Sequence, residues 1–503
     1  MATTTTINPA DEPKAKIEVS ESNFPPVEFN TTLHDLFLDG DKGPLEDTYC
    51  VVKANSDRQY GKVVPLNEKY IIHSAQVSSA DDLAHLCLEI NCYLLLLYAG
   101  KMKVAFIGSE GATDDKTLHK QAVSENARRS FSVLNEAQRP RVSTYANIED
   151  FIQNHDGSNI RWAFAMDFAE RLPSVDHPEL VYKLNSKRWL AHCSLKSAND
   201  TIIDCQISCP EHMTESNLWY YGGKDCRLCG SGVETELHRV RSILLDRPPY
   251  VLKLTQSLSS VGTLLVKNEK ERKEVVDQAE KYLREYLPRV TKENAHLRTT
   301  SLILSDFIPG ETMALNFFIR KNGSVVFLGA CHQLATGESG RQATAITYAE
   351  QEKLQDKYQS TLDMIGQALH EEGYYGPVGA DIMENPDDGT LFTIDANVRS
   401  PLSFVLYLLR GHLNEKRGFA MSLVYECIML TLSRDEFERD FNKELHDARI
   451  ILIGSTRLGE KEQWAHGMVV AGNSQKEIDE LSDRILKFEI EGGQGGDLSD
   501  AAA

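Results

Sequence analysis

Two acidic residues stand within apolar strand segments at equal distances from one turn, and this pattern constrains the fold more than any other. Residues 378–383 and 391–394 are largely apolar, and the sequence Asn-Pro-Asp-Asp-Gly at 385–389 separates them. Asp381 lies inside the first segment and Asp395 directly follows the second, each seven residues from the second aspartate of the turn. The pattern predicts a β-hairpin whose two carboxylates face each other across the ladder.

Asp395 is the first of three polar residues that alternate along the second predicted strand. Asn397 and Arg399 follow at intervals of two, so all three share one face of an extended chain. With Asp381, this face offers three oxygen ligands, and hard cations such as Mg²⁺ or Mn²⁺ use such a set when they also hold phosphates. A polar surface hairpin is the alternative, but charges among apolar strand residues are rarely left without a partner.

The composition indicates a soluble intracellular enzyme. The chain has 503 residues, of which 41% are hydrophobic, so it is long enough for about three or four domains. Its net charge of −20 argues against nucleic acid and against an anionic membrane surface as partners. Ten cysteines do not indicate a secreted disulfide framework, and the polar N-terminus carries no secretory signal. Residues 83–99 predict a buried helix and not a membrane span, so we expect a cytoplasmic location.

The hairpin resembles the metal-binding hairpin of the ATP-grasp superfamily, which includes D-alanine–D-alanine ligase and biotin carboxylase. In that family an acidic residue on one strand pairs with an acid-x-Asn sequence on the next, often followed by Arg. Asp381, Asp395, Asn397 and Arg399 match these positions, and the resemblance implies that the first three hold the metal. One departure is Asp395, where the family usually has Glu.

The resemblance also implies an α/β architecture, namely an ATP-grasp fold with an N-terminal α/β domain before it and a small C-terminal domain after it. Lys103–Ile107 and Trp162–Met166 are strand candidates of the N-terminal domain, while helices are predicted over Asn268–Leu287, Gln351–Leu369 and Gln475–Leu486. The expected sections are a disordered lead at 1–45, the N-terminal α/β domain at 46–180, the ATP-grasp small lobe with a cysteine-containing insertion at 181–290, the large lobe with the metal hairpin at 291–435, the small C-terminal α/β domain at 436–490 and a flexible tail at 491–503.

Two lysines match the family's phosphate-binding positions. Lys187 precedes a predicted helix, where the family has a lysine that reaches the nucleotide phosphates. Lys253 lies in the apolar strand 248–254, and a lysine in such a strand needs an anionic partner. An ordinary surface lysine and an edge lysine that reaches water are the respective alternatives.

The remaining nucleotide contacts are implied by the resemblance. Residues 255–262 stand where the family has a Gly-rich phosphate-covering loop, but here hydroxyl residues replace all glycines except one. The strand at 301–308 and the turn after it correspond to the segment that holds adenine and ribose. The implied nucleotide-binding residues are Lys187, Lys253, Ser259, Ser260, Gly262, Asp306, Phe307, Ile308 and Glu311.

The activity that the resemblance implies is ATP-dependent ligation of a small carboxylic acid to an amine or amino acid through an acyl phosphate. The cofactors would be ATP with Mg²⁺ or Mn²⁺, the partners small molecules, and the state a homodimer in some relatives. Arg399 would stabilise the acyl phosphate, and Arg341 is a candidate clamp for a substrate carboxylate. Two alternatives remain open: a kinase-like enzyme that phosphorylates a hydroxyl or enol, and a catalytically silent ATP-binding module.

Four cysteines between the two lysines form a second candidate site. Cys205 and Cys209 precede Cys226 and Cys229 by a separation of sixteen residues, which is similar to paired zinc knuckles. A structural Zn²⁺ held by these four thiols is one interpretation, and buried core cysteines are the other. His212 lies nearby without an obvious ligand register.

Overall fold

The protein is described by a computed structural model that covers most of the chain. It describes residues 23–38, 47–52, 56–59, 62–65, 68–72, 90, 93–94, 97–107, 128–145, 147–193, 195, 197–247, 249–257, 262–337, 340–457 and 463–490. The predicted flexible tail at 491–503, most of the predicted helix at 83–99 and most of the predicted lead lie outside the described residues.

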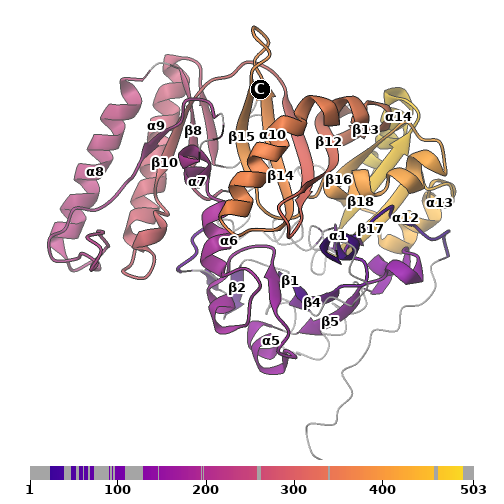
Figure 1. The fold of residues 1–503 in the computed structure, drawn as a ribbon, viewed down its shortest axis with the longest axis horizontal. Coiled ribbons are helices and arrows are strands. Elements are labelled where there is room, and N and C mark those ends of the chain that lie inside the picture. The colour runs from indigo at the N-terminus through magenta and orange to yellow at the C-terminus, as the bar shows by residue number, and fades with distance from the viewer. Residues whose placement is uncertain are drawn as a thin grey trace, which may run out of the picture.

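The N-terminal region contains a four-stranded parallel sheet, which lies below the other regions in Figure 1. Its strand order is β5-β4-β1-β6, with β1 (Thr48–Val52), β4 (Lys103–Ile107), β5 (Arg141–Tyr145) and β6 (Ile160–Trp162). The expected strand at Lys103–Ile107 is present. The second expected strand, Trp162–Met166, was misplaced: β6 spans Ile160–Trp162, and the chain after it leads into a 3-10 helix at Asp167–Arg171.

Part of the lead that we expected to be disordered is folded. Residues 23–38 include helix α1 (Leu33–Leu38), and Val27, Phe29 and Leu33 belong to the hydrophobic core that also contains Phe106 of β4. The apolar residues in this part of the lead bury enough surface to order it. A two-stranded sheet, β2 (Ser56–Gln59) and β3 (Lys62–Pro65), and helix α5 (Ile148–Asn154) complete the named elements of the region.

The small lobe is an antiparallel sheet covered by two long helices, seen at the left of Figure 1. The strand order is β7-β10-β8-β9, with β7 (Thr201–Ile203), β8 (Tyr250–Leu254), β9 (Thr263–Val266) and β10 (Leu302–Asp306), and the helices are α8 (Arg227–Leu245) and α9 (Glu269–Tyr286). Strand β10 pairs with both β7 and β8. The lobe therefore extends past the boundary at 290 that we expected from the sequence.

The large sheet has eight strands in the order β15-β14-β11-β12-β13-β16-β18-β17, all antiparallel to their neighbours. Helix α10 (Gln351–Glu371) packs on its β11–β12–β14 part through the core that contains Leu362 and Ile365. The strands are β11 (Thr312–Ile319), β12 (Val325–Thr336), β13 (Arg341–Thr347), β14 (Gly376–Glu384), β15 (Leu391–Asn397), β16 (Met421–Leu430), β17 (Ile450–Arg457) and β18 (Trp464–Gly472).

The C-terminal section continues this sheet and is not set apart from it. Strands β17 and β18 join it through β16, so the expected boundary at 435/436 crosses a continuous ladder. Helices α12 (Arg434–Asp440), α13 (Asn442–His446) and α14 (Gln475–Leu486) contribute to the core beside these strands, and α14 has the expected bounds. A bilayer-spanning helix is absent from the part of the chain that the structure describes, since none of its helices combines the required length and hydropathy.

Candidate active site

The hairpin β14–β15 brings the two acidic side chains together. Asp381 and Asp395 are direct partners in the antiparallel ladder, as their spacing from the turn predicts. The turn closes through hydrogen bonds between Asn385 and Thr390 and between Gly389 and Asn385, and Gly389 adopts a φ of 70° that favours glycine. The two carboxylates thus lie on one surface of the large sheet.

A β-bulge next to this pair gives Lys253 its partner. The register shifts between Asp381 and Ile382, whose partners are Asp395 and Thr393, so Ile394 faces no residue across the ladder. The Lys253 Nζ donates a hydrogen bond of 2.8 Å to the Ile394 carbonyl oxygen. The bulge therefore anchors a buried lysine of the small lobe directly beside Asp395.

Lys187 reaches the same acid from another element. It is the first residue of helix α7 (Lys187–His192), whose N-cap Ser186 accepts a hydrogen bond from the Arg188 backbone N–H. The Lys187 Nζ lies 3.2 Å from Asp395 Oδ2, and its backbone N–H donates to the Thr255 carbonyl at 3.0 Å. Lys187 is 7% exposed, so this ion pair is largely removed from water.

The surroundings of the two acids shift their pKa values in opposite directions. Burial and the charge of Asp395 raise the pKa of Asp381 to about 7. Burial also disfavours ionised Asp395, but Lys187 and Lys253 outweigh it and hold the pKa of Asp395 below its ordinary value. Burial lowers the pKa of Lys253, which Asp200 and Asp395 partly oppose. One acid is therefore fully ionised at neutral pH, while the other lacks a sufficient counter-charge.

Asn397 is the last residue of β15, and Arg399 lies two residues beyond the end of the strand, where its backbone N–H donates to the Asn397 carbonyl at 2.8 Å. Arg399 donates to Asn185 Oδ1 at 3.0 Å, and its guanidinium carbon lies 5.3 Å from the centre of the Phe164 ring. Asn185 ends helix α6 (Pro178–Leu184), and its Oδ1 also accepts from the Val398 N–H at 3.0 Å. Lys187, Asp395, Asn397, Arg399, Asn185 and Phe164 are among the residues that line one cavity.

The predicted adenine and ribose residues lie where β10 ends. Asp306 is exposed and accepts a hydrogen bond of 2.7 Å from Asn199, and Phe307 is 40% exposed, which is unusual for a large apolar side chain. Ile308 is half-buried and Glu311 exposed. These four positions remain predictions, because accessibility alone does not identify a nucleotide contact.

The predicted phosphate loop is described only at its two ends. Ser259 and Ser260 lie outside the described residues. Gly262 accepts a hydrogen bond from the Leu254 N–H at 2.8 Å, which places the end of the loop directly beside β8 and Lys253. A Cβ on Gly262 would lie 2.5 Å from the Ser257 Cβ, so glycine allows the two ends of the loop to approach closely.

Arg341 is engaged elsewhere. Its guanidinium forms an ion pair with Glu489 and donates to the Cys427 carbonyl at 3.0 Å. It is not among the residues that line the cavity with Arg399. The expected role as a substrate clamp therefore has no support in the structure, since its guanidinium is held by Glu489 near the end of the described chain and by Cys427 of β16.

The cysteine site has a different membership from the one expected. Cys205 is buried in the small-lobe core, and its thiol approaches the Ile203 carbonyl at 3.5 Å. Cys209, Cys226 and Cys229 instead converge with His212. The cysteine spacing predicted Cys205 as the fourth ligand of the site. In the structure, His212 lies beside the other three cysteines in its place.

Sequence reasoning also missed the groups that position the cluster. Asn185 has no predicted role in the sequence analysis, and the Ile394 carbonyl has no signal in its side chain. Asp200, which accepts a hydrogen bond from Ser305, acts on Lys253 through its charge. Asn185 could have been found from its position two residues before Lys187.

Three solved structures that are similar to this chain share 9% to 12% of its sequence. N5-carboxyaminoimidazole synthetase from Staphylococcus aureus complexed with ADP is 12% identical, with 93% of this chain and 99% of that chain covered and a TM-score of 0.43. The L-amino acid ligase from Bacillus licheniformis is 12% identical, with 88% and 97% covered and a TM-score of 0.40. Biotin carboxylase from Campylobacter jejuni is 9% identical, with 88% and 91% covered and a TM-score of 0.44.

The sequence itself matches one family. No curated protein matches this chain. Residues 247–400, however, match the family of the ATP-grasp domain. This segment contains Lys253, Arg399 and both strands of the acidic hairpin. The chain therefore carries an ATP-grasp domain within this segment.

Proposed function

We propose that this protein is an ATP-dependent ligase that joins a small carboxylic acid to an amine or amino acid and releases ADP and phosphate. The observation that carries the proposal is the convergence of Asp381, Asp395, Lys187 and Lys253 within a matched ATP-grasp domain. Acids from the large sheet and lysines from α7 and the small lobe meet at one point, which suits a nucleotide held between the lobes.

The residues present fit a divalent cation. Asp381 and Asp395 offer carboxylate oxygens on adjacent strands, and Asn397 offers an amide oxygen on the same face as Asp395. The pKa of Asp381 is raised because burial and the charge of Asp395 outweigh the nearby cations Lys187, Arg399 and Lys253. Mg²⁺ or Mn²⁺, when bound, would neutralise phosphate charge and polarise the transferred phosphoryl group.

The two lysines would neutralise the nucleotide phosphates. Lys253 is fixed by the Ile394 carbonyl and Lys187 by Asp395, so neither charge needs to be reoriented when the substrate binds. Such preorganised charge stabilises a transition state more than mobile charge does. Asp381, Asp395 and Asn397 would hold the cation that shares the phosphate charge with these lysines.

The reaction then needs positioning more than acid–base chemistry. An oxygen of the substrate carboxylate attacks the γ-phosphorus, and the bond from that phosphorus to the ADP oxygen breaks. The amine nitrogen next attacks the acyl carbon, the carbon–oxygen bond to phosphate breaks, and the phosphate leaves with the electron pair while the amine releases a proton to solvent. Arg399, held by Asn185 over Phe164, would stabilise the negative charge of the acyl phosphate.

The first test measures ADP and phosphate release by coupled assay, with Mg²⁺ or EDTA and a panel of acids and amines. Turnover that requires metal, acid and amine together supports the ligase. Turnover with a hydroxyl or enol compound alone indicates the kinase-like alternative. ATP binding without turnover across a broad panel favours the silent module.

The matched variants are Asp395→Asn and Asp387→Asn. Asp395→Asn removes the charge that faces Lys187 and one proposed metal ligand, so turnover should fall by about 10² or more. Asp387 lies exposed in the turn of the same hairpin, and its variant should retain turnover. Full activity of Asp395→Asn would contradict the metal assignment.

A further inference from the structure

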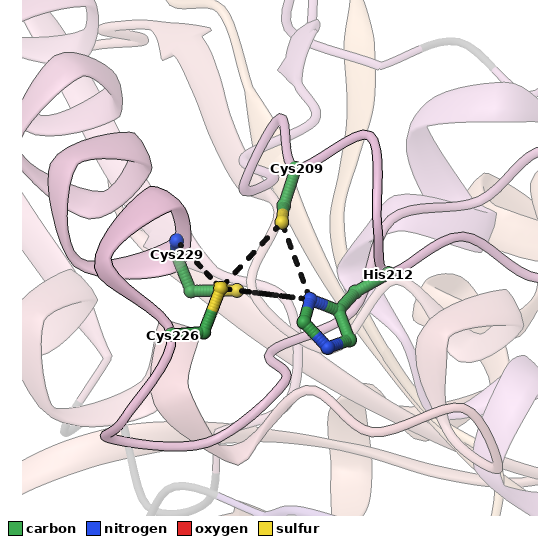
Figure 2. A group of neighbouring side chains, drawn as sticks. All are labelled: Cys209, His212, Cys226 and Cys229. Atoms are coloured by element: carbon green, nitrogen blue, oxygen red, sulfur yellow. Dashed lines mark hydrogen bonds between the residues drawn. The ribbon is translucent and has the colours of Figure 1, made fainter.

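Four potential metal ligands converge in the connection between β7 and α8, away from the acidic hairpin. They are Cys209, His212, Cys226 and Cys229, and their ligand atoms all lie within 4.8 Å of one another. Figure 2 shows the His212 imidazole directed toward the three thiols, with Cys226 and Cys229 at the start of α8 and Cys209 on the preceding loop. Two sequence-distant parts of the connection thus meet at one point.

The distances agree with the edges of a tetrahedron around one ion. Zn–S bonds of about 2.3 Å and Zn–N bonds of about 2.0 Å place two sulfurs roughly 3.8 Å apart and a sulfur and a nitrogen roughly 3.5 Å apart. The Sγ atoms of Cys209 and Cys226 are 3.9 Å apart. The His212 Nδ1 lies 3.2, 3.8 and 3.5 Å from the sulfurs of Cys209, Cys226 and Cys229.

Hydrogen bonding among thiols does not account for this arrangement. A neutral imidazole nitrogen either donates one hydrogen bond or accepts one, yet Nδ1 of His212 faces three sulfurs at once. A disulfide does not account for it either, because its sulfur–sulfur distance is about 2.0 Å. A single ion at the centre satisfies all four atoms together.

The surrounding backbone supports the ligands. The Cys229 N–H donates to the Cys226 sulfur at 3.4 Å, and the Gly222 N–H donates to the Cys229 sulfur at 3.3 Å. Such donors stabilise thiolates and orient them toward a metal. A Cβ at Gly222 would lie 2.0 Å from Cε1 of the His212 ring, so only glycine leaves room for the imidazole there.

We infer that Cys209, His212, Cys226 and Cys229 form a tetrahedral Zn²⁺ site. Three thiolates and one imidazole are a set that zinc prefers, and binding requires that the three thiols release their protons. The protein fills all four positions, which is typical of structural and not of catalytic zinc. The site is independent of the proposed ligase activity, because none of its residues lines the cavity with Arg399.

The consequence of the site is the anchoring of the small lobe. Cys226 is the N-cap of α8, which packs against α9 over the sheet that carries Lys253. The loop before it is held at Tyr221, whose N–H donates to the Val290 carbonyl at 2.8 Å. Zinc would therefore fix the loop that carries Cys209 and His212 to helix α8, which covers the sheet of this lobe.

The direct test is metal analysis of the purified full chain. We expect about one zinc per chain, and Co²⁺ in its place should give the visible bands of a tetrahedral site together with sulfur-to-cobalt charge transfer. A chain that neither contains nor takes up zinc under reducing conditions would overturn the proposal, as would a six-coordinate cobalt spectrum. These measurements need no variant and no enzymatic activity.

Variants then identify the ligands. His212→Cys keeps four ligands, so it should retain zinc and shift the cobalt bands, whereas Cys209→Ser should lower zinc content well below one per chain. Cys205→Ala is the matched control and should keep full zinc, because its thiol points to Ile203. Loss of zinc from Cys205→Ala with retention in Cys209→Ser would show that the ligand set is wrong.

A second pair of variants changes space and leaves every ligand in place. Gly222→Ala should displace the imidazole and accelerate zinc transfer to a chelator at least tenfold. Gly230→Ala, in the first turns of α8 with no atom within 4 Å of its added Cβ, should leave the transfer rate unchanged. Equal rates in both variants would contradict the inferred position of His212.

Discussion

At the scale of single residues, each of the two buried lysines of the candidate site has a specific partner. Lys253 is 7% exposed, and its ammonium is bonded to a backbone carbonyl that a bulge leaves available. Lys187 is equally buried and is paired with Asp395. Polar and charged groups inside a fold are tolerated when each is satisfied in this way, and both lysines thereby gain a fixed position.

A buried histidine of the C-terminal section gives a prediction about pH. The His466 Nε2–H donates to the Leu432 carbonyl at 2.9 Å, so Nδ1 is the acceptor for the Ser455 hydroxyl at 2.8 Å. Burial lowers the pKa of His466 to about 4, because a charged ring would lose its hydration and its acceptor role. The ring is therefore neutral in the folded protein at physiological pH.

Falling pH destabilises the folded protein through His466, because the unfolded chain binds a proton at this residue more readily than the folded chain does. The unfolded chain takes up a proton near pH 6.5, while the folded chain does so only near pH 4, so stability is lost as pH falls between these values. The full loss is roughly 3 kcal/mol in free energy of unfolding. Urea unfolding at several pH values should show a smaller loss in His466→Gln than in the natural protein, and parallel curves would contradict the neutral ring.

At the scale of elements, the sequence predicted the hairpin well and its bulge not at all. Asp381 and Asp395 face each other as predicted, but the pairs nearest the turn, such as Glu384 with Leu391, would by themselves place Asp381 opposite Ile394. The bulge shifts the pairing by one residue and brings Asp395 into that position. The extra residue, Ile394, has an ordinary apolar side chain, so nothing in the sequence marks it. The helices α10 and α14 were predicted from apolar spacing, which reports the buried face directly.

Deletion of Ile394 tests whether the bulge serves the site. The deletion converts the ladder to a regular one in which Asp395 still faces Asp381 and Thr393 still faces Ile382. What is lost is the carbonyl that holds Lys253, so we expect turnover to fall at least about tenfold while the fold persists. Circular dichroism and the coupled assay measure both properties.

The matched control is Ile394→Val, which keeps the backbone carbonyl and most of the side chain. It should retain turnover close to that of the natural protein. If the deletion protein is folded and fully active, the contact between Lys253 and the bulge has no part in catalysis.

At the scale of the whole molecule, local patterns did not define where one section ends and the next begins. Strand β10 belongs to the small lobe because it pairs with β8, and β17 and β18 belong to the large sheet because β18 pairs with β16. These partners are far apart in the sequence. The same reason explains why His212, and not Cys205, joins the cysteines: the folding of the loop after β7 decides it. Long-range pairing is the information that periodicity and motif spacing lack.

The arrangement of the lobes leads to a final prediction about ligand-linked stability. Lysines from α7 and β8 and acids from the large sheet meet at one place, so a nucleotide–metal complex bound there would contact both lobes. A ligand that binds only the folded state stabilises it by about 2.7 kcal/mol at a concentration 100 times its Kd. A non-hydrolysable ATP analogue should therefore raise the Tm, and Mg²⁺ should increase that rise.

The metal-dependent part of the rise should disappear in the double variant Asp381→Asn with Asp395→Asn, because both carboxylate ligands are then lost. The exposed control Asp387→Asn should keep it in full. If EDTA leaves the analogue's stabilisation of the natural protein unchanged, the acidic hairpin does not hold a metal with the nucleotide. If the double variant loses the metal-dependent part alone, the lysines bind the phosphates and the acids bind the cation.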